Sequence, residues 1–238
     1  MKKIIGIAPA PVIGNADDCS MLSYYKLGNN YINRASEAGC VPIGLAPVNL
    51  WLHEEALEMC DGFLVQGGAE FYPYHFQIIH HALIRGKRYL GICLGEQLIY
   101  VYFEIRRRVE ERGYQGDLVE AICKYIEEQG PDFSVQQKIP NHRSQLPKKG
   151  CEDEAKHDVN IVAGTLLHRL VGKDKIRVAS FHNLNTPPTQ TLVKINAYSA
   201  LGDGVVEGTE YGENILGVQG HPEIDGLLPE IFAFLAMD

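Results

Sequence analysis

The 238-residue sequence lacks a basic patch and any long apolar run. Its formal net charge is −8, and its one arginine run, residues 106–108, is flanked by Glu104, Glu110 and Glu111. Because binding to phosphate backbones needs clustered Lys and Arg, we expect no nucleic-acid partner. No apolar run approaches the length of a membrane span, and the apolar segment near residue 4 is too short for a signal peptide. We therefore expect no membrane partner and a cytoplasmic location.

Paired metal-ligand motifs are also missing. The six cysteines are scattered without a C-x-x-C pair: Cys19, Cys40, Cys60, Cys93, Cys123 and Cys151. Without a secretion signal, free thiols are expected rather than a disulfide framework. His53 and Glu54 begin like a zinc-protease helix, but the second histidine four residues on is absent. His75, His80 and His81 show no ligand spacing and are expected on a helix surface. We expect no metal and no cofactor.

What the chain does contain is an alternation of short apolar runs with helical patterns. Strands are expected at residues 3–8, 41–45, 62–65 and 89–92, and helices at 21–38, 50–59 and 76–84. This order predicts an α/β fold with a mostly parallel central sheet and helices on both faces. The length fits one domain over residues 1–238.

The segment GICLGEQ, residues 91–97, joins an expected strand to an expected helix. A tight turn of this kind forces its central residue into a strained conformation, and Gly91 and Gly95 would relieve the crowding around it. Cys93 would then project at a helix N-terminus, whose backbone amides stabilise a thiolate and can receive an oxyanion. The alternative is a buried, inert cysteine packed between glycines.

A second segment, GVQGHPE at residues 217–223, supplies partners for such a nucleophile. An expected strand over residues 215–219 would deliver His221 to the carboxyl edge of the sheet, where ligands of parallel sheets collect. Glu223 could hold the other ring nitrogen. A surface loop with a capping glutamate is the alternative. Taken together, Cys93, His221 and Glu223 match the nucleophile, base and orienting residue of covalent catalysis.

These two segments resemble the class I glutamine amidotransferases, whose triad is the Cys of a G-x-C-x-G turn and the His and Glu of an H-P-E sequence. The resemblance implies a flavodoxin-like fold. It also implies an oxyanion hole made by the Gly67-Gly68 backbone, in the segment DGFLVQGG, and by the amide of Leu94. Gln97 is a substrate contact by resemblance alone. His182 is expected either to line the acyl pocket or to be a structural histidine.

Further features resemble one branch of the family, the γ-glutamyl hydrolases that cleave amides such as γ-glutamyl-γ-aminobutyrate. These features are Pro73 and Tyr74, residues 137–140 (QKIP), 157–159 (HDV), 164–167 (GTLL), 180–182 (SFH) and 203–207 (DGVVE). The chain departs from that branch at His182-Asn183-Leu184, where two adjacent histidines and a glutamine are usual. It also has Ala69-Glu70 where an Asp usually follows the glycines. These departures leave the substrate open.

A third departure is a charged insertion at approximately residues 104–134. A sparse apolar set suggests an amphipathic helix interrupted near Gly113 and Gly116; the set is Val109, Leu118, Ile122 and Ile126. We expect it to form a lid or a homodimer contact that narrows the choice of leaving group. A surface helix without function is the alternative.

Three functions remain open at this stage. The leading one is a cysteine-dependent hydrolase that cleaves a small-molecule γ-glutamyl amide through a thioester on Cys93. The second is a glutaminase subunit that passes ammonia to a separate synthetase partner. The third is a non-catalytic binding or sensor protein on the same scaffold.

Overall fold

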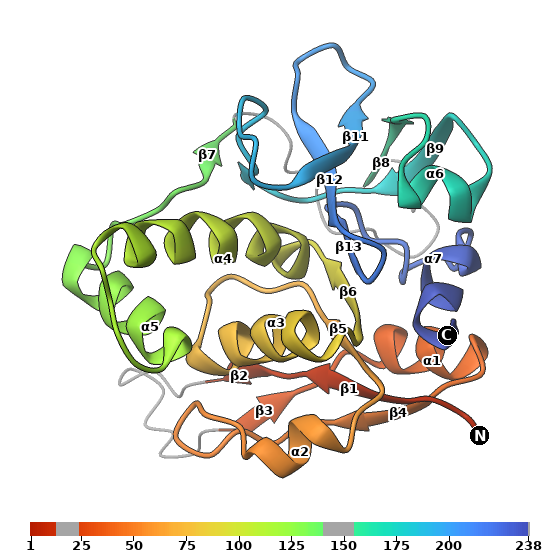
Figure 1. Ribbon diagram of the computed structural model, residues 1–238. Coiled ribbons are helices and arrows are strands. Elements are labelled where there is room, and N and C mark those ends of the chain that lie inside the picture. Colours follow the sequence, from red (N-terminus) through yellow and green to blue (C-terminus); the bar gives the residue numbers. More distant parts are fainter. Residues whose placement is uncertain (13–23, 140–154, 238) are drawn as a thin grey trace, which may run out of the picture.

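The fold is built on a nine-stranded sheet in the order β4-β1-β5-β6-β13-β12-β11-β8-β9 (Figure 1). The computed structural model describes residues 1–12, 24–139 and 155–237. The strands of this sheet are β1 (Ile4–Ala8), β4 (Val41–Gly44), β5 (Gly62–Val65), β6 (Arg88–Ile92), β8 (Lys156–Ile161), β9 (Lys175–Ala179), β11 (Lys194–Ser199), β12 (Val206–Tyr211) and β13 (Ile215–Val218).

Strands β4, β1, β5, β6 and β13 run parallel to one another. The register aligns Ile7 with Leu64, Leu64 with Leu90, and Leu90 with Leu216. Every residue of β5 and of β13 is buried, as expected for parallel strands covered on both faces. The carboxyl ends of β5, β6 and β13 therefore lie side by side, which brings the loops after Val65, Ile92 and Val218 to one edge.

The remaining strands, β12, β11, β8 and β9, pair antiparallel and extend the sheet beyond β13. Two small antiparallel pairs lie outside it: β2 (Ala10–Val12) with β3 (Tyr24–Lys26), and β7 (Gln137–Lys138) with β10 (Leu184–Asn185). The predicted α/β class is confirmed, and the antiparallel half is an addition to the predicted pattern.

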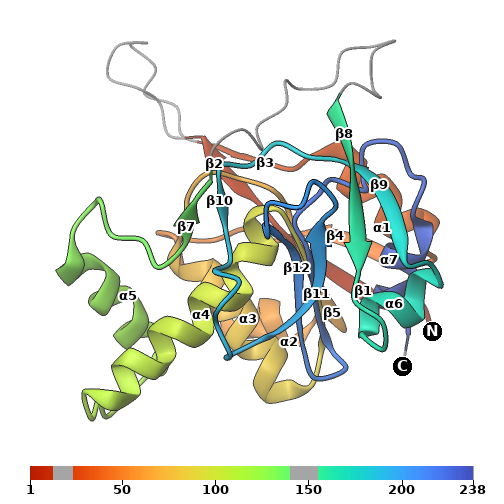
Figure 2. The same ribbon diagram turned by 90° about the horizontal axis from the view of Figure 1, so that it is seen from above.

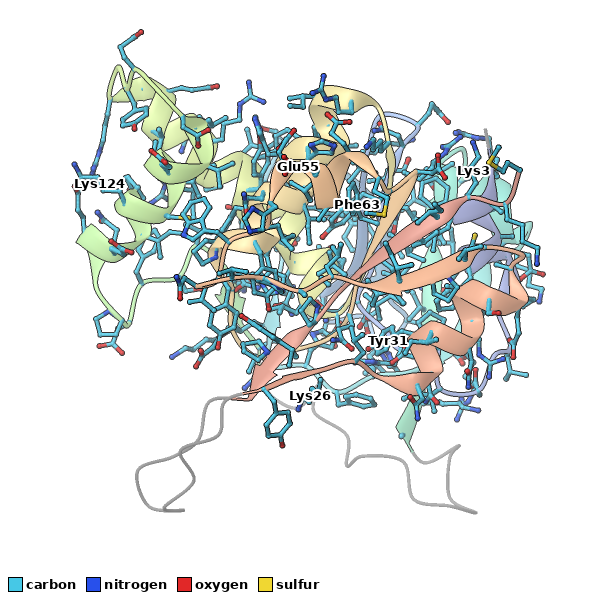
Figure 3. All side chains as sticks on the ribbon, turned by 90° about the horizontal axis from the view of Figure 1, so that it is seen from below. Lys3, Lys26, Tyr31, Glu55, Phe63 and Lys124 are labelled. Atoms are coloured by element: carbon cyan, nitrogen blue, oxygen red, sulfur yellow. The ribbon has the colours of Figure 1, made fainter. Side chains whose placement is uncertain are left out.

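Helices cover both faces of the sheet, as Figure 2 shows from above. The helices are α1 (Asn29–Glu37), α2 (Glu54–Glu58), α3 (Pro73–Arg85), α4 (Leu94–Glu111), α5 (Leu118–Gln129), α6 (Leu166–Val171) and α7 (Pro229–Ala233), with a 3₁₀ turn at Phe234–Ala236. One apolar core lies beneath α2 to α5 and the other beneath α1, α6 and α7. Phe63 of β5 is fully buried between these layers, whereas Lys124 projects from α5 (Figure 3).

Two predicted helices have the wrong boundaries. The helix expected from residue 21 begins at Asn29, because Tyr24–Lys26 pairs with Ala10–Val12 as β3. Residues 21–23 lie outside the described ranges, as do Pro140, Cys19 and Cys151. The helix expected from residue 50 begins at Glu54, because Asn49 and Leu50 adopt positive φ angles in a turn.

The charged segment after residue 103 forms the end of α4 and all of α5. Helix α4 ends at Glu111, Gly113 and Gly116 both have positive φ, and α5 begins after Asp117, whose carboxylate accepts the Glu120 amide at 2.9 Å. Its apolar residues pack into the core with α3 and α4.

Within the described residues, no helix combines the length and the apolar character needed to cross a bilayer.

Candidate active site

The turn between β6 and α4 holds Cys93 in a strained conformation. Its backbone angles are φ 55° and ψ −102°, a region that residues with a side chain rarely occupy. A Cβ on Gly91 would lie 2.2 Å from the carbonyl oxygen of Gly95, and a Cβ on Gly95 would lie 2.4 Å from that of Val65. Only glycine fits at either position, so the two glycines of GICLGEQ allow the turn, for the steric reason inferred from the sequence.

The loop after β5 lies directly beside this turn. A Cβ on Gly68 would be 2.9 Å from Cδ2 of Leu94, and a Cβ on Gly67 would be 3.5 Å from Cβ of Cys93. Within the described ranges, the amides of Gly68 and Leu94 donate no hydrogen bond. The Gly67 amide instead donates to the hydroxyl of Tyr31 at 3.1 Å. Of the three residues expected to form an oxyanion hole, Gly68 and Leu94 therefore have the free donors.

His221 and Glu223 lie in the loop after β13 and form a buried pair. The distance from Nδ1 of His221 to Oε1 of Glu223 is 2.7 Å, and the two residues are only 5% and 3% exposed. The His221 backbone amide donates to the carbonyl of Ala179 at 2.8 Å, and the ring stacks on Phe181 with centroids 4.0 Å apart. Ala179 at the end of β9 thus holds the His221 backbone, and Phe181 just after it holds the imidazole ring.

The imidazole also lies beside the cysteine. A Cβ on Gly67 would be 3.0 Å from Cε1 of His221, on the same small patch that approaches Cys93. Burial alone would lower the pKa of His221, but interactions with the Cys93 side chain and the Glu223 carboxylate outweigh it and raise that pKa well above its usual value. The site therefore favours a protonated imidazole between Cys93 and Glu223.

Gln97 and His182 lie on the other side of Cys93, where both are held by protein groups. The Gln97 amide nitrogen donates to the Leu184 carbonyl at 3.0 Å and to Oε1 of Gln219 at 2.9 Å. Its oxygen accepts from Gln136 at 2.7 Å. His182 is 4% exposed, with Nδ1 3.0 Å from the Leu184 carbonyl and Nε2 3.4 Å from Oε1 of Glu207. Both side chains are buried, with their polar atoms in contact with protein groups.

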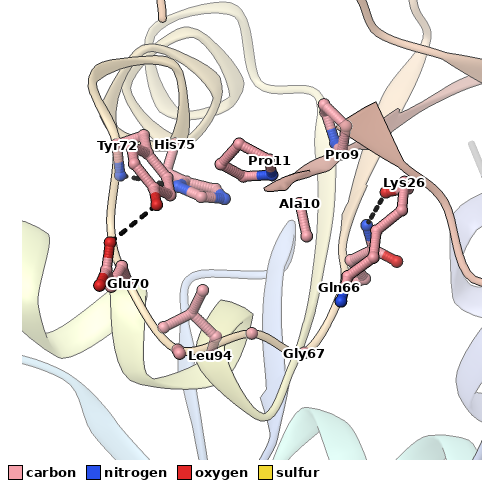
Figure 4. A pocket seen from close by; sticks show the side chains of 12 residues that line it. Pro9, Ala10, Pro11, Lys26, Gln66, Gly67, Glu70, Tyr72, His75 and Leu94 are labelled. Atoms are coloured by element: carbon pink, nitrogen blue, oxygen red, sulfur yellow. Dashed lines mark hydrogen bonds between the residues drawn. The ribbon is translucent and has the colours of Figure 1, made fainter. Parts of the chain in front are cut away.

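A cavity of about 380 Å³ opens beside the Gly68 and Leu94 amides (Figure 4). Its charged side chains are Lys26 and Glu70, and Glu70 accepts the Tyr72 hydroxyl at 2.7 Å. The full lining is Pro9, Ala10, Pro11, Lys26, Gln66, Gly67, Gly68, Ala69, Glu70, Tyr72, His75 and Leu94. No residue of the segment 104–134 contributes to this lining. The cavity has the size and the mixed charge suited to a small zwitterionic molecule.

Several site residues carry no local signal in the sequence. Tyr31 is one aromatic residue of an amphipathic helix, and Phe181 follows an ordinary strand. Glu96 was visible within GICLGEQ, and its position in the first turn of a helix facing the sheet could have marked it as a buried acid. It is 0% exposed and accepts the Thr209 hydroxyl at 2.8 Å.

Outside the site, Glu54, Glu58 and His81 gather closely enough to suggest a metal site. Cationic side chains already occupy the cluster: Arg85 pairs with Glu58 at 2.6 Å, and Nζ of Lys87 lies 3.1 Å from Nε2 of His81. These residues therefore fit a metal poorly.

The expected surface position of the histidines is wrong for His75 and His81, which are each 3% exposed. Residues from other parts of the chain pack against α3 and bury both histidines, and a local sequence pattern does not contain this information.

The parallel sheet with a strained cysteine after one strand and a histidine–glutamate pair after the next defines a class I glutamine amidotransferase-like protein. The family model of peptidase C26 matches residues 73–223, more than half of the sequence. The chain belongs to the peptidase C26 family. This confirms the resemblance at the level of the superfamily and indicates an enzyme that hydrolyses C–N bonds.

Individual relatives agree with this assignment. The chain is 28% identical over 201 residues to a CTP synthase from Sulfurimonas denitrificans, covering 76% of this chain but 36% of that protein. The chain thus spans about a third of the length of this relative. The acivicin-bound glutaminase domain of Trypanosoma brucei CTPS is similar in fold, with a TM-score of 0.65 and 17% identity over 99% of this chain and 93% of that one. PurLQS from Thermotoga maritima has a TM-score of 0.57 and 16% identity, over 99% and 98% of the two chains.

Proposed function

We propose that the protein is a cysteine-dependent hydrolase that cleaves a γ-glutamyl amide through a thioester on Cys93. The observation that carries this proposal is the convergence of three loops. The strained Cys93, the His221–Glu223 pair and the free amides of Gly68 and Leu94 come together at one sheet edge. Nucleophile, proton carrier and oxyanion donors are the groups that acyl transfer requires.

In the first half-reaction, the Cys93 sulfur attacks the γ-carbonyl carbon, and the carbonyl oxygen becomes an anion facing the Gly68 and Leu94 amides. The C–N bond then breaks, and the imidazolium of His221 gives its Nε2 proton to the leaving amine. In the second, His221 takes a proton from water, which attacks the thioester carbon. The C–S bond breaks, releasing glutamate and the thiolate, while Glu223 holds Nδ1 in one orientation throughout.

The γ-glutamyl half of the substrate follows from the resemblance to the hydrolase branch. The cavity supports it, because Lys26 and Glu70 offer charges opposite to a carboxylate and an ammonium group. We propose Gln97 and His182 as residues that border the bound acyl group. Gln97 would exchange one of its three hydrogen bonds for the substrate, since its amide is fully engaged within the protein.

The second candidate is a glutaminase subunit that passes ammonia to a synthetase. The similarity to a CTP synthase, over about a third of that protein, favours it. The two candidates differ in their leaving group. The hydrolase releases an amine larger than ammonia and needs room for it. The glutaminase subunit releases ammonia, and its activity should rise when its synthetase is added. The third candidate, a non-catalytic sensor, is opposed by the complete triad.

We propose that the insertion, residues 104–134, forms a homodimer contact rather than a lid. Helix α5 packs on α3 and α4, and none of the residues lining the cavity come from it. The segment after α5 does reach the site, because Gln136 donates to Gln97 at 2.7 Å.

The test is release of glutamate from a panel of γ-glutamyl amines, γ-glutamyl peptides, polyglutamates and free glutamine. Cys93→Ala is the control for contaminating hydrolases. We expect at least one γ-glutamyl amine to be cleaved faster than free glutamine. Preference for glutamine, with ammonia production stimulated by a separate synthetase, would favour the second candidate. Absence of turnover on the whole panel would reject both.

A further inference from the structure

Tyr31 of α1 lies where the oxyanion loop meets the histidine–glutamate pair. It is 8% exposed, and its hydroxyl is 3.1 Å from the Gly67 amide nitrogen and 3.5 Å from Nδ1 of His221. Figure 3 labels Tyr31 on this helix. Its two contacts belong to loops separated from it by 36 and 190 residues. One hydroxyl therefore touches both halves of the site.

The protons around this hydroxyl can be assigned from its neighbours. Its oxygen accepts the Gly67 N–H. Nδ1 of His221 carries a hydrogen that points to Glu223 at 2.7 Å, so it cannot also accept one from Tyr31. The Tyr31 hydrogen is then directed towards the Glu223 carboxylate, which interacts with this hydroxyl. Its Oε2 atom is buried and has no hydrogen-bond partner within the described ranges. Burial and the Glu223 charge also raise the pKa of Tyr31 well above its usual value, which keeps the hydroxyl protonated.

We propose that Tyr31 is a positioning residue that couples the oxyanion loop to the histidine–glutamate pair. This inference rests on the proposed function of the same site. By accepting from Gly67, the hydroxyl fixes the Gln66–Gly67 peptide, one residue before the Gly68 amide, and so aims that amide at the oxyanion. By directing its hydrogen towards the Glu223 carboxylate, it also stabilises the charged partner of His221.

The rest of α1 supports both contacts. The Gln66 side chain accepts the Gly28 amide at 3.0 Å and donates to the Lys26 carbonyl at 3.0 Å, which ties the oxyanion loop to the start of the helix. At the other end, Nε of Arg34 donates to the Glu223 carbonyl at 3.3 Å. The helix therefore spans the two loops as one rigid element, with Tyr31 between the two ties.

The test is Tyr31→Phe, which removes only the hydroxyl. Tyr102→Phe is the matched control, because the Tyr102 hydroxyl is also buried against a histidine, 2.8 Å from Nδ1 of His80, but outside the site. For Tyr31→Phe we expect kcat to fall about tenfold with KM within about twofold, since the acceptor Glu223 and the Gly68 amide lose their alignment. Tyr102→Phe should leave both constants unchanged.

The second measurement is NMR titration of His221, which needs no substrate. Loss of the Tyr31 donor makes the Glu223 carboxylate a stronger partner for the imidazolium, so the pKa of His221 should rise in Tyr31→Phe. A merely structural tyrosine would leave this pKa unchanged or lower it through loosened contacts, and either result would overturn the proposal. If the wild-type enzyme cleaves nothing on the substrate panel, the titration still tests Tyr31, so the two failures are distinguishable.

If Tyr31→Phe does not fold, the wild-type protein provides the test. The Tyr31 hydroxyl proton should be a slowly exchanging resonance close to the His221 ring, and the Gly67 amide should be protected from exchange. Rapid exchange of both would overturn the proposal.

Discussion

The two sides of Cys93 are built differently. On the open side lie Gly67, Gly68, Leu94 and the cavity of about 380 Å³, with two backbone amides that donate to none of the described residues. On the closed side, the side chains of Glu96, Gln97, Thr209 and Gln219 fill the space with bonds to one another and to the backbone. The open side is suited to bind and react, and the closed side to hold the cysteine in place.

The difference follows from where each side lies in the sheet. The open side is formed by loops that leave the carboxyl ends of parallel strands and need not pair with anything. The closed side is the seam where α4 crosses β13 and β12, so its polar groups are buried and must find partners. Substitutions on the open side should therefore affect activity, and those on the closed side, apart from the proposed substrate contact Gln97, should affect stability and its dependence on pH.

The largest effect should come from the pair that serves the open side. We expect His221→Ala to lower kcat about 10⁴-fold and Glu223→Gln about 10²-fold, because only His221 transfers protons while Glu223 orients it. Steady-state kinetics on the best panel substrate measures both, with circular dichroism to confirm folding. Equal losses, or a greater loss for Glu223→Gln, would contradict this division of roles.

Gly91 tests the turn that separates the two sides. A side chain there would collide with the Gly95 backbone at 2.2 Å, so Gly91→Ala should lower the free energy of unfolding by about 3 kcal/mol or more. Gly86→Ala is the control, since Gly86 has a positive φ of 65° but open space around it; its cost should be about 1 kcal/mol. Urea unfolding compares the two. Similar losses would mean that the close approach at Gly91 is readily relieved.

The four cysteines in the described ranges should differ in reactivity, because among them only Cys93 adjoins the open side. Burial raises the pKa of Cys60 to about 11 and that of Cys123 to about 12, and it also raises the pKa of Cys40. With a limiting amount of a glutamine-like electrophile, Cys93 should be labelled at least about tenfold faster than these three. Peptide mass spectrometry gives the order, and labelling of another cysteine first would remove Cys93 from its role.

Glu96 tests the closed side, where the expected effect is on the pH dependence of stability rather than on activity. Burial, with a contribution from Glu207, raises its pKa to about 8 against hydrogen bonds from Thr209 and Thr186. The folded protein then binds a proton that the unfolded chain has released. Stability should therefore fall as the pH rises from the ordinary glutamate range towards 8, by at most about 1.4 kcal/mol for each pH unit.

Glu96→Gln removes this titration and keeps an acceptor for Thr209, so its free energy of unfolding should be less dependent on pH than that of the wild type. The measurement is urea unfolding at pH 6, 7 and 8. The exposed Glu55→Gln is the control and should follow the wild type. Parallel pH curves for wild type and Glu96→Gln would show that Glu96 does not titrate in this range.

The sequence by itself determined the features that local sterics dictate. The parallel strands follow from short apolar runs, and the turn at Cys93 from two glycines that no other residue can replace. The interruption of the insertion follows from Gly113 and Gly116, which take positive φ. Apart from the contact of Gly95 with Val65, each of these depends on neighbours a few residues away, so a linear pattern contains the information.

Only the tertiary structure decided which residues far apart in the sequence contact one another. The pairing of Tyr24–Lys26 with Ala10–Val12 delayed the start of the predicted helix to Asn29, and packing buried His75, His81 and Glu96 where a local pattern shows only polar residues. Gly67 was expected to donate to an oxyanion, yet its amide is taken by Tyr31, 36 residues away. Whether a backbone donor is free, or a carboxylic acid is shielded from water, depends on chain segments that meet only after folding. Hydrogen-bond satisfaction and solvent exclusion are properties of the packed molecule.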